Sequence, residues 1–451
     1  MPRPQETIAA LATPAGTAAL AIIRVSGLAA ARLTQEIFGS APLPRTARHA
    51  DYRDVTGGLL DDVLYTFFRG PHSYTGEDSL EVSCHGNPFV AQKILEDLLA
   101  RGCRPAGPGE FTQRAFLNGR MDLSQAEAVM DLIRARSDRA LMVAHQQLRG
   151  ALGRRLETLT AGLLGVLARI EAYIDFPEED LPPEECGTIA GELEHIARET
   201  DRLLATSHYG EILRDGIKTV IIGAPNAGKS SLLNRLVGHD RALVSEEPGT
   251  TRDFIEERMM VGPHALRLID TAGLNPRPTA LEKMGMGKTL ERAAEADLIL
   301  LVIDATQPAP ALPAELASRL KEDNTLVILN KMDLAGAIPT AVAPARLPAL
   351  RVSALTGAGV DELVAAIVRC ADSFQHDVGD DLVAINARHG HALGRAQSCL
   401  GEARKKISLN AATELLASDL RGALDAFGEI SGKIDNERML DLLFATFCIG
   451  K

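Results

Sequence analysis

Short apolar runs alternate with helix-like segments across residues 215–372, and few folds accept this pattern. The runs have the length of β-strands and lie at residues 218–222, 266–270, 298–304, 326–330 and 350–353. Strand and helix patterns that alternate in this way are typical of a parallel sheet with crossover helices. The sequence therefore predicts an α/β domain in residues 215–372.

The segments on either side predict two further domains. Residues 1–118 combine β-type runs at 19–25, 63–68 and 79–83 with a helix at 88–101, which indicates a small α+β domain. Residues 119–214 and 373–451 are mostly helical, so we expect them to form one helical domain from two chain segments. The predicted fold is therefore multidomain, with α+β, all-α and inserted α/β parts.

Composition excludes several classes of protein. A net charge of −12 argues against a uniformly basic coat for nucleic acid, so any RNA contact is local or shared. The six cysteines are too widely spaced for a zinc site, and no apolar run is long enough to cross a bilayer. We expect a cytoplasmic protein without membrane contact. The densest basic run fits a solvated helix face better than an RNA contact, and it contains Arg134, Arg136, Arg139, Arg149, Arg154 and Arg155.

A glycine-rich turn follows the apolar run 218–222 and precedes a helix-like segment. It reads Gly-Ala-Pro-Asn-Ala-Gly-Lys-Ser from residue 223 to residue 230. Glycines let the backbone N–H groups face phosphate oxygens, and the helix N-terminus adds a favourable dipole. We expect Lys229 to reach the β- and γ-phosphates and the Ser230 hydroxyl to hold Mg²⁺. The predicted contacts of this loop are Asn226, Ala227, Gly228, Lys229, Ser230 and Ser231.

Three further motifs end apolar runs. Asp270, Thr271, Ala272 and Gly273 suit a Mg²⁺-bound water and the γ-phosphate. Asp333 in the Asn330, Lys331, Met332, Asp333 motif can accept hydrogen bonds from the two donors of guanine, which adenine lacks. The next run ends in Ser353, Ala354 and Leu355, which would support the base from its other side. Because the carboxyl ends of parallel strands meet at one edge, these motifs predict a P-loop GTPase domain with a Ras-like sheet that binds GTP.

Hydrolysis needs a group that orients water. Leu274 stands where many GTPases carry a glutamine, and its apolar side chain cannot polarise water. Glu282 is a candidate, with a surface helix position as the alternative. Asn226 could offer its carbonyl oxygen to a monovalent cation, or it could be an exposed turn residue. The switch position between the phosphate loop and Asp270 is taken by residues 249–253, where one threonine should complete the Mg²⁺ shell.

Taken together, these motifs resemble the MnmE (TrmE) family of tRNA modification GTPases over essentially the whole chain. The matching segments are 13–14, 24–27, 176–177, 223–231, 249–253, 270–274 and the final Cys-Ile-Gly-Lys at 448–451. The resemblance implies a K⁺-activated GTPase that forms a homodimer. It implies that, with the flavoprotein MnmG in a heterotetramer, the protein modifies C5 of the wobble uridine of tRNA to an aminomethyl or carboxymethylaminomethyl derivative. GTP hydrolysis would drive dimerisation of the GTPase domains and a conformational change.

Site residues follow from the resemblance by position. Ser230 and Thr251 would bind Mg²⁺, and Glu282 would orient the attacking water. The nucleotide and K⁺ loop would comprise Ser245, Glu246, Glu247, Pro248, Gly249, Thr250 and Thr251, with Asn226, Ser245, Glu247 and Thr250 as the K⁺ ligands. The N-terminal domain would bind 5,10-methylene- or 5-formyl-tetrahydrofolate through Arg24, Glu81, Arg120 and Lys451.

Two of these positions depart from the family pattern. Arg120 stands where the family usually has lysine, which keeps the charge but changes the donor geometry. The K⁺ loop is more acidic than expected. Cys448 could be a nucleophile without a paired base or a buried thiol near the folate site.

Two alternatives to the GTPase enzyme stay open at the level of sequence. One is a ribosome-assembly GTPase that acts as a binding switch, although such proteins usually carry a basic RNA-binding domain. The other is a folate-binding module in which the GTPase only times a conformational change of the partner.

Overall fold

The computed structural model describes residues 6–39, 43–175, 183–239, 256–269, 291–308, 312–334, 347–374, 383–409, 412–432 and 443–450. The chain divides into two compact units, Met1–Met130 with Gln147–Asp180 and Ala411–Lys451, and Asp131–Gln146 with Leu181–Asn410. Two separate six-stranded sheets and a set of long helices confirm the predicted multidomain fold class. The predicted domain boundaries after residues 118, 214 and 372 stay predictions.

The first unit contains a largely antiparallel sheet with strand order β3-β4-β5-β2-β1-β6. Its strands are β1 (Ile8–Leu11), β2 (Leu20–Ser26), β3 (Arg48–Arg53), β4 (Leu59–Phe68), β5 (Ser79–His85) and β6 (Arg104–Pro105). One face is covered by α1 (Ala30–Phe38) and α2 (Pro88–Ala100), which share a buried apolar core with the strands. The helix predicted at 88–101 begins where the Asn87 side chain accepts a hydrogen bond from the Phe89 N–H at 2.9 Å.

The opposite face of this sheet meets α3 (Glu110–Leu117). Ile8 and Ala10 point to this face from β1 and form a small apolar cluster with Ala106 and Phe111. The C-terminal segment 443–450 belongs to the same unit, and Ile449 forms a β-bridge with Pro108. Residues from both ends of the sequence therefore build this side of the domain.

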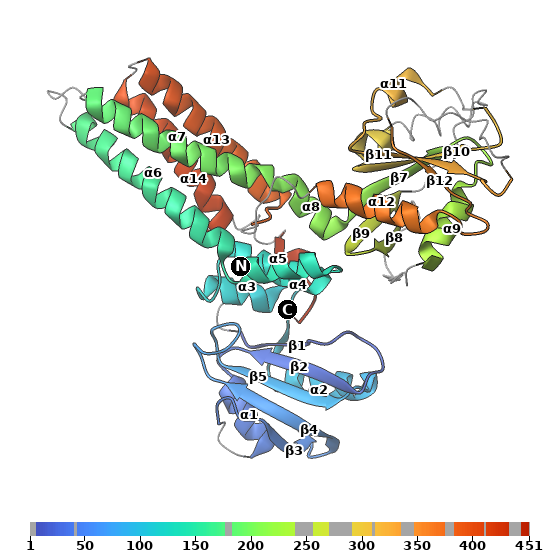
Figure 1. Cartoon of the computed structure of the whole chain (residues 1–451). Coiled ribbons are helices and arrows are strands. Elements are labelled where there is room, and N and C mark those ends of the chain that lie inside the picture. The colour runs from blue at the N-terminus through green and yellow to red at the C-terminus, as the bar shows by residue number, and fades with distance from the viewer. Residues whose placement is uncertain are drawn as a thin grey trace, which may run out of the picture. The chain divides into compact units, whose positions relative to one another are not determined.

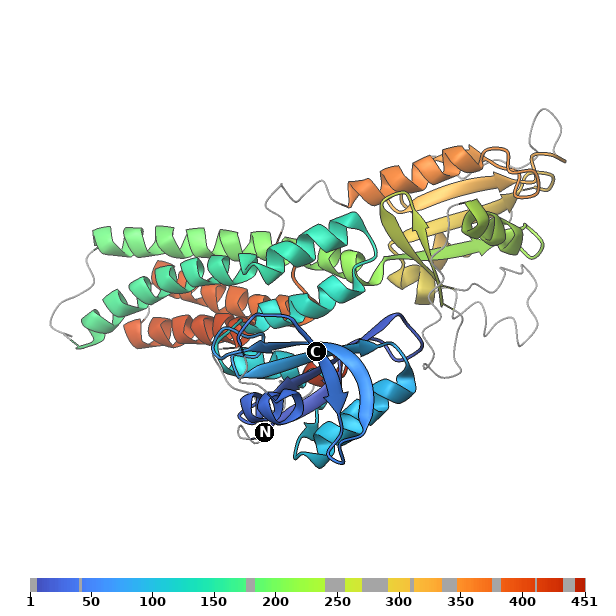
Figure 2. The same cartoon turned by 90° about the horizontal axis from the view of Figure 1, so that it is seen from below.

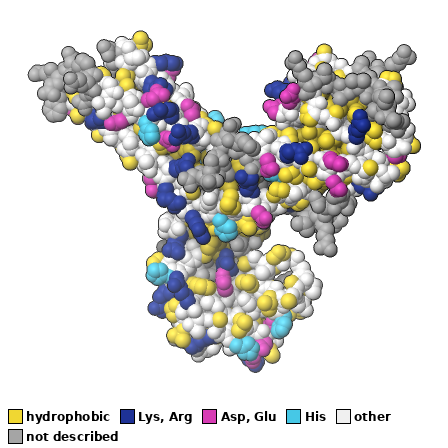
Figure 3. All heavy atoms as spheres, viewed as in Figure 1, with side chains coloured by type: hydrophobic (Ala, Val, Ile, Leu, Met, Phe, Trp, Pro, Cys, Tyr) yellow, Lys and Arg dark blue, Asp and Glu magenta, His cyan; other side chains and the backbone are white. Residues whose placement is uncertain are grey.

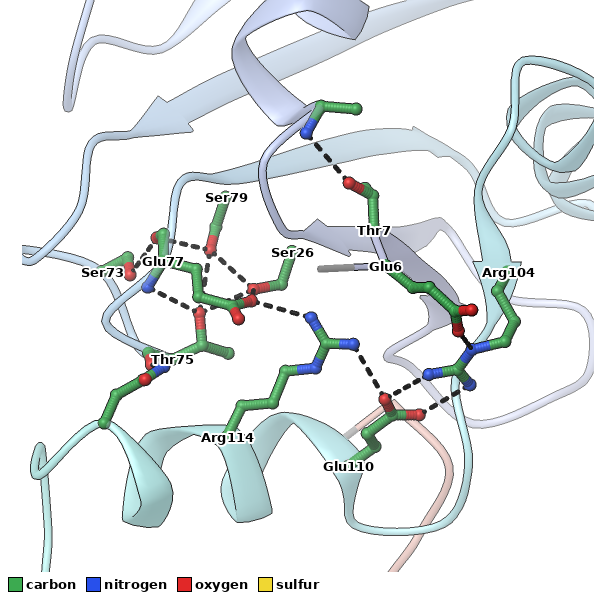
Figure 4. A network of polar contacts seen from close by, with 12 residues as sticks. Glu6, Thr7, Ser26, Ser73, Thr75, Glu77, Ser79, Arg104, Glu110 and Arg114 are labelled. Carbon is green, nitrogen blue, oxygen red and sulfur yellow. Dashed lines mark hydrogen bonds and ion pairs between the residues drawn. The ribbon is translucent and has the colours of Figure 1, made fainter. Parts of the chain in front are cut away.

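A chain of charged side chains, of which Glu110 and Arg114 are buried, holds α3 beside the sheet. The Arg114 guanidinium lies between two carboxylates, at 2.9 Å from Glu77 and 2.9 Å from Glu110 (Figure 4). Glu110 also accepts hydrogen bonds from Arg104. Burial raises the pKa of Glu110, but the hydrogen bonds from Arg104, the Gly107 N–H and Arg114 outweigh burial and hold that pKa below its usual value. The ionised carboxylate therefore ties β6 to α3.

Long helices occur in both units and pack in pairs. In the first unit α6 (Ala151–Asp175) packs along α14 (Thr413–Ser431), and an ion pair joins Glu171 to Arg421 at 2.8 Å. In the second unit α7 (Pro183–Ala205) packs along α13 (Ala387–Ser408) (Figure 2). The chain passes between the units within α4 (Leu123–Arg134) and α5 (Asp138–Leu148). A shorter helix, α8 (Ser207–Asp215), leads into the second sheet.

The second unit contains the predicted α/β sheet, with strand order β12-β11-β10-β7-β9-β8. Its strands are β7 (Ile217–Gly223), β8 (Glu256–Val261), β9 (His264–Ile269), β10 (Leu298–Asp304), β11 (Thr325–Asn330) and β12 (Ala349–Arg351). All are parallel except β8, which pairs antiparallel with β9 at the edge and was not predicted. Alternate residues of the central strands enter separate apolar clusters, so the sheet is buried on both faces.

Among the described residues of this domain, helices pack on both faces of the sheet (Figure 1). They include α8, α9 (Lys229–His239), the short α11 (Ala314–Ala317) and α12 (Val360–Ser373). Leu232 and Leu236 of α9 and Leu363 of α12 enter the same cluster on one face. Because α9 follows β7 directly, its N-terminus lies at the carboxyl end of the sheet, where the predicted nucleotide motifs also end their strands.

Candidate functional site

The turn between β7 and α9 leaves no room for side chains at two of its glycines. A Cβ at Gly223 would lie 2.3 Å from the carbonyl oxygen of Val302 in β10, and a Cβ at Gly228 would lie 2.2 Å from Asn330 Nδ2. Gly228 has φ +94° and Asn226 has φ +60°, so the loop reverses direction before the helix. Lys229 Nζ donates to the carbonyls of Gly223 at 3.1 Å and Ala224 at 3.0 Å. The ammonium group is therefore folded over the loop.

Asn330 connects this loop to two other strand ends. Asn330 is buried, with only 2% of the residue exposed. Nδ2 donates to the Ala227 carbonyl at 2.9 Å, and Oδ1 accepts from the Ala354 N–H at 2.9 Å. The Asn330 side chain thus holds both the glycine-rich loop and the 353–355 segment against the end of β11.

Side chains of β10 and of the 353–355 segment form hydrogen bonds with Lys331 and Asp333, which follow Asn330. Lys331 has φ +63°, and its ammonium pairs with Asp304 Oδ2 at 2.7 Å. Burial raises the pKa of Asp304, but hydrogen bonds from Lys331 and Thr306 outweigh it and hold that pKa below its usual value. Asp333 is exposed, and its Oδ1 accepts from Ser353 Oγ at 2.6 Å. The carboxylate predicted to select the base is therefore oriented at the surface beside the glycine-rich loop.

Sequence reasoning missed Asp304 and Arg235. Asp304 ends β10 and lies opposite Asn330 in the strand register, so the acid at the end of a predicted strand was a usable signal. Arg235 of α9 donates to the carbonyls of Ala354 and Leu355. It had no signal in the sequence, because it contacts residues more than a hundred positions away.

Several predicted site residues lie outside the described residues. These are Ser245, Glu246, Glu247, Pro248, Gly249, Thr250, Thr251, Asp270, Thr271, Ala272, Gly273, Glu282 and Lys451. The structure brings together the loop 226–231, the motif at 330–333 and the segment 353–355. Within the described residues no group of three or more His, Cys, Asp or Glu side chains could hold a metal ion.

A second candidate site lies in the N-terminal sheet. Arg24 of β2 and Glu81 of β5 are direct partners in the strand register, and their side chains pair at 2.7 Å with partial exposure. The Arg24 guanidinium lies over the rings of Tyr74 and Phe111, at 5.4 and 5.7 Å from their centroids. It also donates to the Gly450 carbonyl at 3.4 Å. A cation, a carboxylate and two aromatic rings therefore converge at the C-terminal segment.

The other residues predicted for this second site are only partly accounted for. Arg120 is exposed after α3, and its Cγ would lie 3.2 Å from a Cβ added at Gly76. Cys448 is exposed, and its carbonyl accepts from the Gly109 N–H at 3.3 Å. The interpretation of Cys448 as a buried thiol is therefore wrong. Tyr74 and Phe111 were not predicted, because aromatic residues at such separations carry no spacing signal.

The surface of the described residues is mixed in character. On the face drawn in Figure 3, Lys and Arg side chains are interspersed with acidic and hydrophobic ones. Among the helices that the structure describes, none combines the length and the apolar character needed to cross a membrane.

Comparisons with known proteins cover the whole chain. A family described as "MnmE helical domain" matches residues 123–448, and one described as "GTP-binding protein TrmE N-terminus" matches residues 7–120. The tRNA modification GTPase MnmE of Opitutus terrae is 59% identical over 452 residues, with 100% of each chain covered. The protein of the same name from Akkermansia muciniphila is 45% identical, also with 100% of each chain covered.

Among solved structures, the G domain of the FeoB iron transporter of T. maritima is similar to 34% of this chain. The match covers 98% of that domain at 27% identity, with a TM-score of 0.25. The two family matches and the full-length relatives agree with the resemblance carried by the motifs. This chain therefore belongs to the MnmE family of tRNA modification GTPases.

Proposed function

We propose that the chain binds GTP where the glycine-rich loop, residues 330–333 and residues 353–355 meet, and that it hydrolyses GTP in the modification of tRNA. The observation that carries this proposal is the Asn330 side chain, which joins Ala227 to Ala354 with two hydrogen bonds of 2.9 Å. A phosphate-binding turn and a base-selecting carboxylate are useful only at a fixed separation. Asn330 provides that separation.

The phosphate end of the site has a matching chemistry. Lys229 Nζ is held by two loop carbonyls, at 3.1 and 3.0 Å, and phosphate oxygens are stronger acceptors for the same ammonium group. The loop N–H groups and the N-terminus of α9 would add further donors. Ser230 at the start of α9, together with Thr251, would hold Mg²⁺, which when bound neutralises charge on the β- and γ-phosphates.

The base end of the site selects guanine. Asp333 is oriented by Ser353 Oγ at 2.6 Å, so its carboxylate can face the ring N–H and the amine of guanine. Adenine offers no such pair of donors, and the carboxylate would then be left without partners. We infer that Glu282 orients the attacking water, because Leu274 cannot do so.

A monovalent cation site is proposed at Asn226. The left-handed backbone at this residue, φ +60°, turns the loop where its amide oxygen would serve as a ligand. Oxygen donors from Asn226, Ser245, Glu247 and Thr250 suit a hard cation, and K⁺ when bound would add positive charge near the β–γ bridge.

The potassium proposal predicts a salt-specific rate. GTP turnover by the full chain should rise about 10-fold or more when K⁺ replaces Na⁺, a modest part of the roughly 10³-fold that a transition-state cation supplies elsewhere. Asn226→Ala should lose this response, and its affinity for GDP measured in Na⁺ shows how much of the loss comes from nucleotide binding. Phosphate release measured in matched chloride salts is the test, and equal wild-type rates in both salts would contradict the cation site.

The N-terminal site is proposed to bind a reduced folate. The Arg24 and Glu81 pair offers donors and acceptors to a pterin ring, and the rings of Tyr74 and Phe111 flank the same cation. Arg120 and Lys451 would contact the glutamate tail. Tetrahydrofolate when bound would supply the one-carbon unit for C5 of the wobble uridine. We further propose that the protein is cytoplasmic, forms a homodimer and acts in a heterotetramer with MnmG.

The function is tested by the tRNA product. Cells without this chain should contain wobble uridines that lack the aminomethyl-type group, and expression of the chain should restore the group. Mass spectrometry of nucleosides from purified tRNA measures both states. If tRNA is fully modified without the chain while ribosomal subunits accumulate unassembled, the ribosome-assembly alternative is favoured instead.

A further inference from the structure

One contact of the nucleotide domain is not explained by the motifs. We use the name base loop for residues 353–355, which follow β12 and precede α12. Arg235 lies on α9, less than two helical turns after Lys229, and points to this loop from the phosphate side of the site. Its Nε donates to the Ala354 carbonyl at 3.1 Å, and its Nη2 donates to the Leu355 carbonyl.

The end of the base loop gains little from apolar burial. Ala354 is buried in the apolar core, whereas Leu355 is 75% exposed. The chain turns back through Gly357 and Gly359, which have φ +90° and +75°. The exposed end of such a loop opens at low free-energy cost unless hydrogen bonds from rigid elements restrain it.

Asn330 and Arg235 restrain the base loop from different sides. Asn330 Oδ1 accepts from the Ala354 N–H at 2.9 Å, while Arg235 binds the carbonyl of the same residue. The orientation of the Ala354 peptide groups is therefore set by β11 and by α9 together. Ser353, the preceding residue, donates to Asp333 Oδ1, so the orientation of the base loop also affects the orientation of the Asp333 carboxylate.

We propose that Arg235 is a positioning residue for guanine recognition. Its side chain links α9, the helix that follows the glycine-rich loop, to the base loop. This inference rests on the proposed binding of guanine at Asp333. The planar guanidinium donates to two carbonyls at once, and a lysine ammonium on its flexible stem matches that geometry poorly. Charged donors to backbone carbonyls also make stronger hydrogen bonds than neutral ones.

Three variants of the full chain test the proposal. Arg235→Ala should lower GDP affinity about 10-fold, as expected for a site whose competent conformation falls to about a tenth of the population. Arg235→Lys should recover part of the loss. Arg369→Ala, which removes an exposed arginine on α12, is the matched control and should bind GDP as the wild type does. Affinities come from competition with a fluorescent GDP analogue.

The informative readout is selectivity rather than affinity alone. Inosine diphosphate lacks the guanine amine and so gains less from a well-oriented Asp333. The ratio of GDP to inosine diphosphate affinity should therefore fall in Arg235→Ala while the melting temperature stays that of the wild type. An unchanged ratio, or equal losses of both affinities with a lower melting temperature, would show that Arg235 only supports the fold.

The proposed function and this inference fail in different ways. A wild-type chain that binds ADP as well as GDP would overturn the guanine site itself. A wild-type chain that selects GDP, with an Arg235→Ala variant that selects it equally well, would overturn only the role of Arg235.

Discussion

Asp333→Asn should lower the affinity of the chain for GTP by about 10³-fold. A carboxylate that accepts from both guanine donors contributes two charge-assisted hydrogen bonds of about 1.5–3 kcal/mol each. The substituted amide keeps one acceptor but turns an N–H donor towards a donor of the base. Because Asp333 is exposed, the fold should not change, and the melting temperature of the nucleotide-free chain should match that of the wild type. Equilibrium binding of a fluorescent GTP analogue measures the loss.

A base with the opposite pattern provides the control for Asp333→Asn. Xanthosine triphosphate carries a carbonyl where guanine carries the amine, so the variant should bind it better than GTP while the wild type prefers GTP. If the affinities of the variant for both nucleotides fall equally, Asp333 does not distinguish guanine from xanthine. If it keeps GTP, the base is bound elsewhere.

Gly228→Ala should abolish measurable GTP binding by the full chain. The added Cβ would lie 2.2 Å from Asn330 Nδ2, in a backbone conformation of φ +94° that alanine rarely adopts. The left-handed conformation alone costs about 1–2 kcal/mol. Relief of the clash moves Asn330 away from Ala227 and leaves buried polar groups without partners, at about 1–3 kcal/mol each. Isothermal calorimetry with GDP and GTP is the measurement.

A helical glycine supplies the comparison for Gly228→Ala. Gly394 lies within α13, and a Cβ at this position would meet nothing within 4 Å. Gly394→Ala should leave nucleotide binding unchanged and raise the stability by about 0.5–1 kcal/mol, because alanine favours the helix. Normal nucleotide binding by Gly228→Ala would show that the loop moves freely against β11.

The central strands β7, β10 and β11 could be predicted because each one is apolar on both faces. Ile221 and Ile222 enter opposite cores, so β7 reads as a continuous apolar run that ends in the glycine-rich turn. The edge strand β8 contains Glu256, Glu257 and Arg258 and has no such run, which explains why it was missed. A strand that is buried on both faces shows a continuous apolar run in the sequence, whereas a strand at the edge of a sheet does not.

The motifs could be predicted as separate elements but not as a connected site. Each motif ends a strand, and the parallel sheet requires those ends to share an edge. The hydrogen bonds of Asn330 to Ala227 and Ala354 depend on side-chain geometry across more than one strand, which no local pattern encodes. The same holds for Arg235, whose partners are 119 and 120 residues away in the chain.

The contact of the C-terminal segment with the N-terminal sheet has a consequence for biosynthesis. Arg24 donates to the carbonyl of Gly450, 426 residues later, and the Gly109 N–H donates to Cys448. The strands β1 to β6 leave the ribosome early, whereas the segment that contacts Arg24 is translated 426 residues later, after the nucleotide domain. A nascent chain can therefore fold its nucleotide domain before the segment that completes the N-terminal pocket has been translated, so translation order makes this pocket mature after the nucleotide domain.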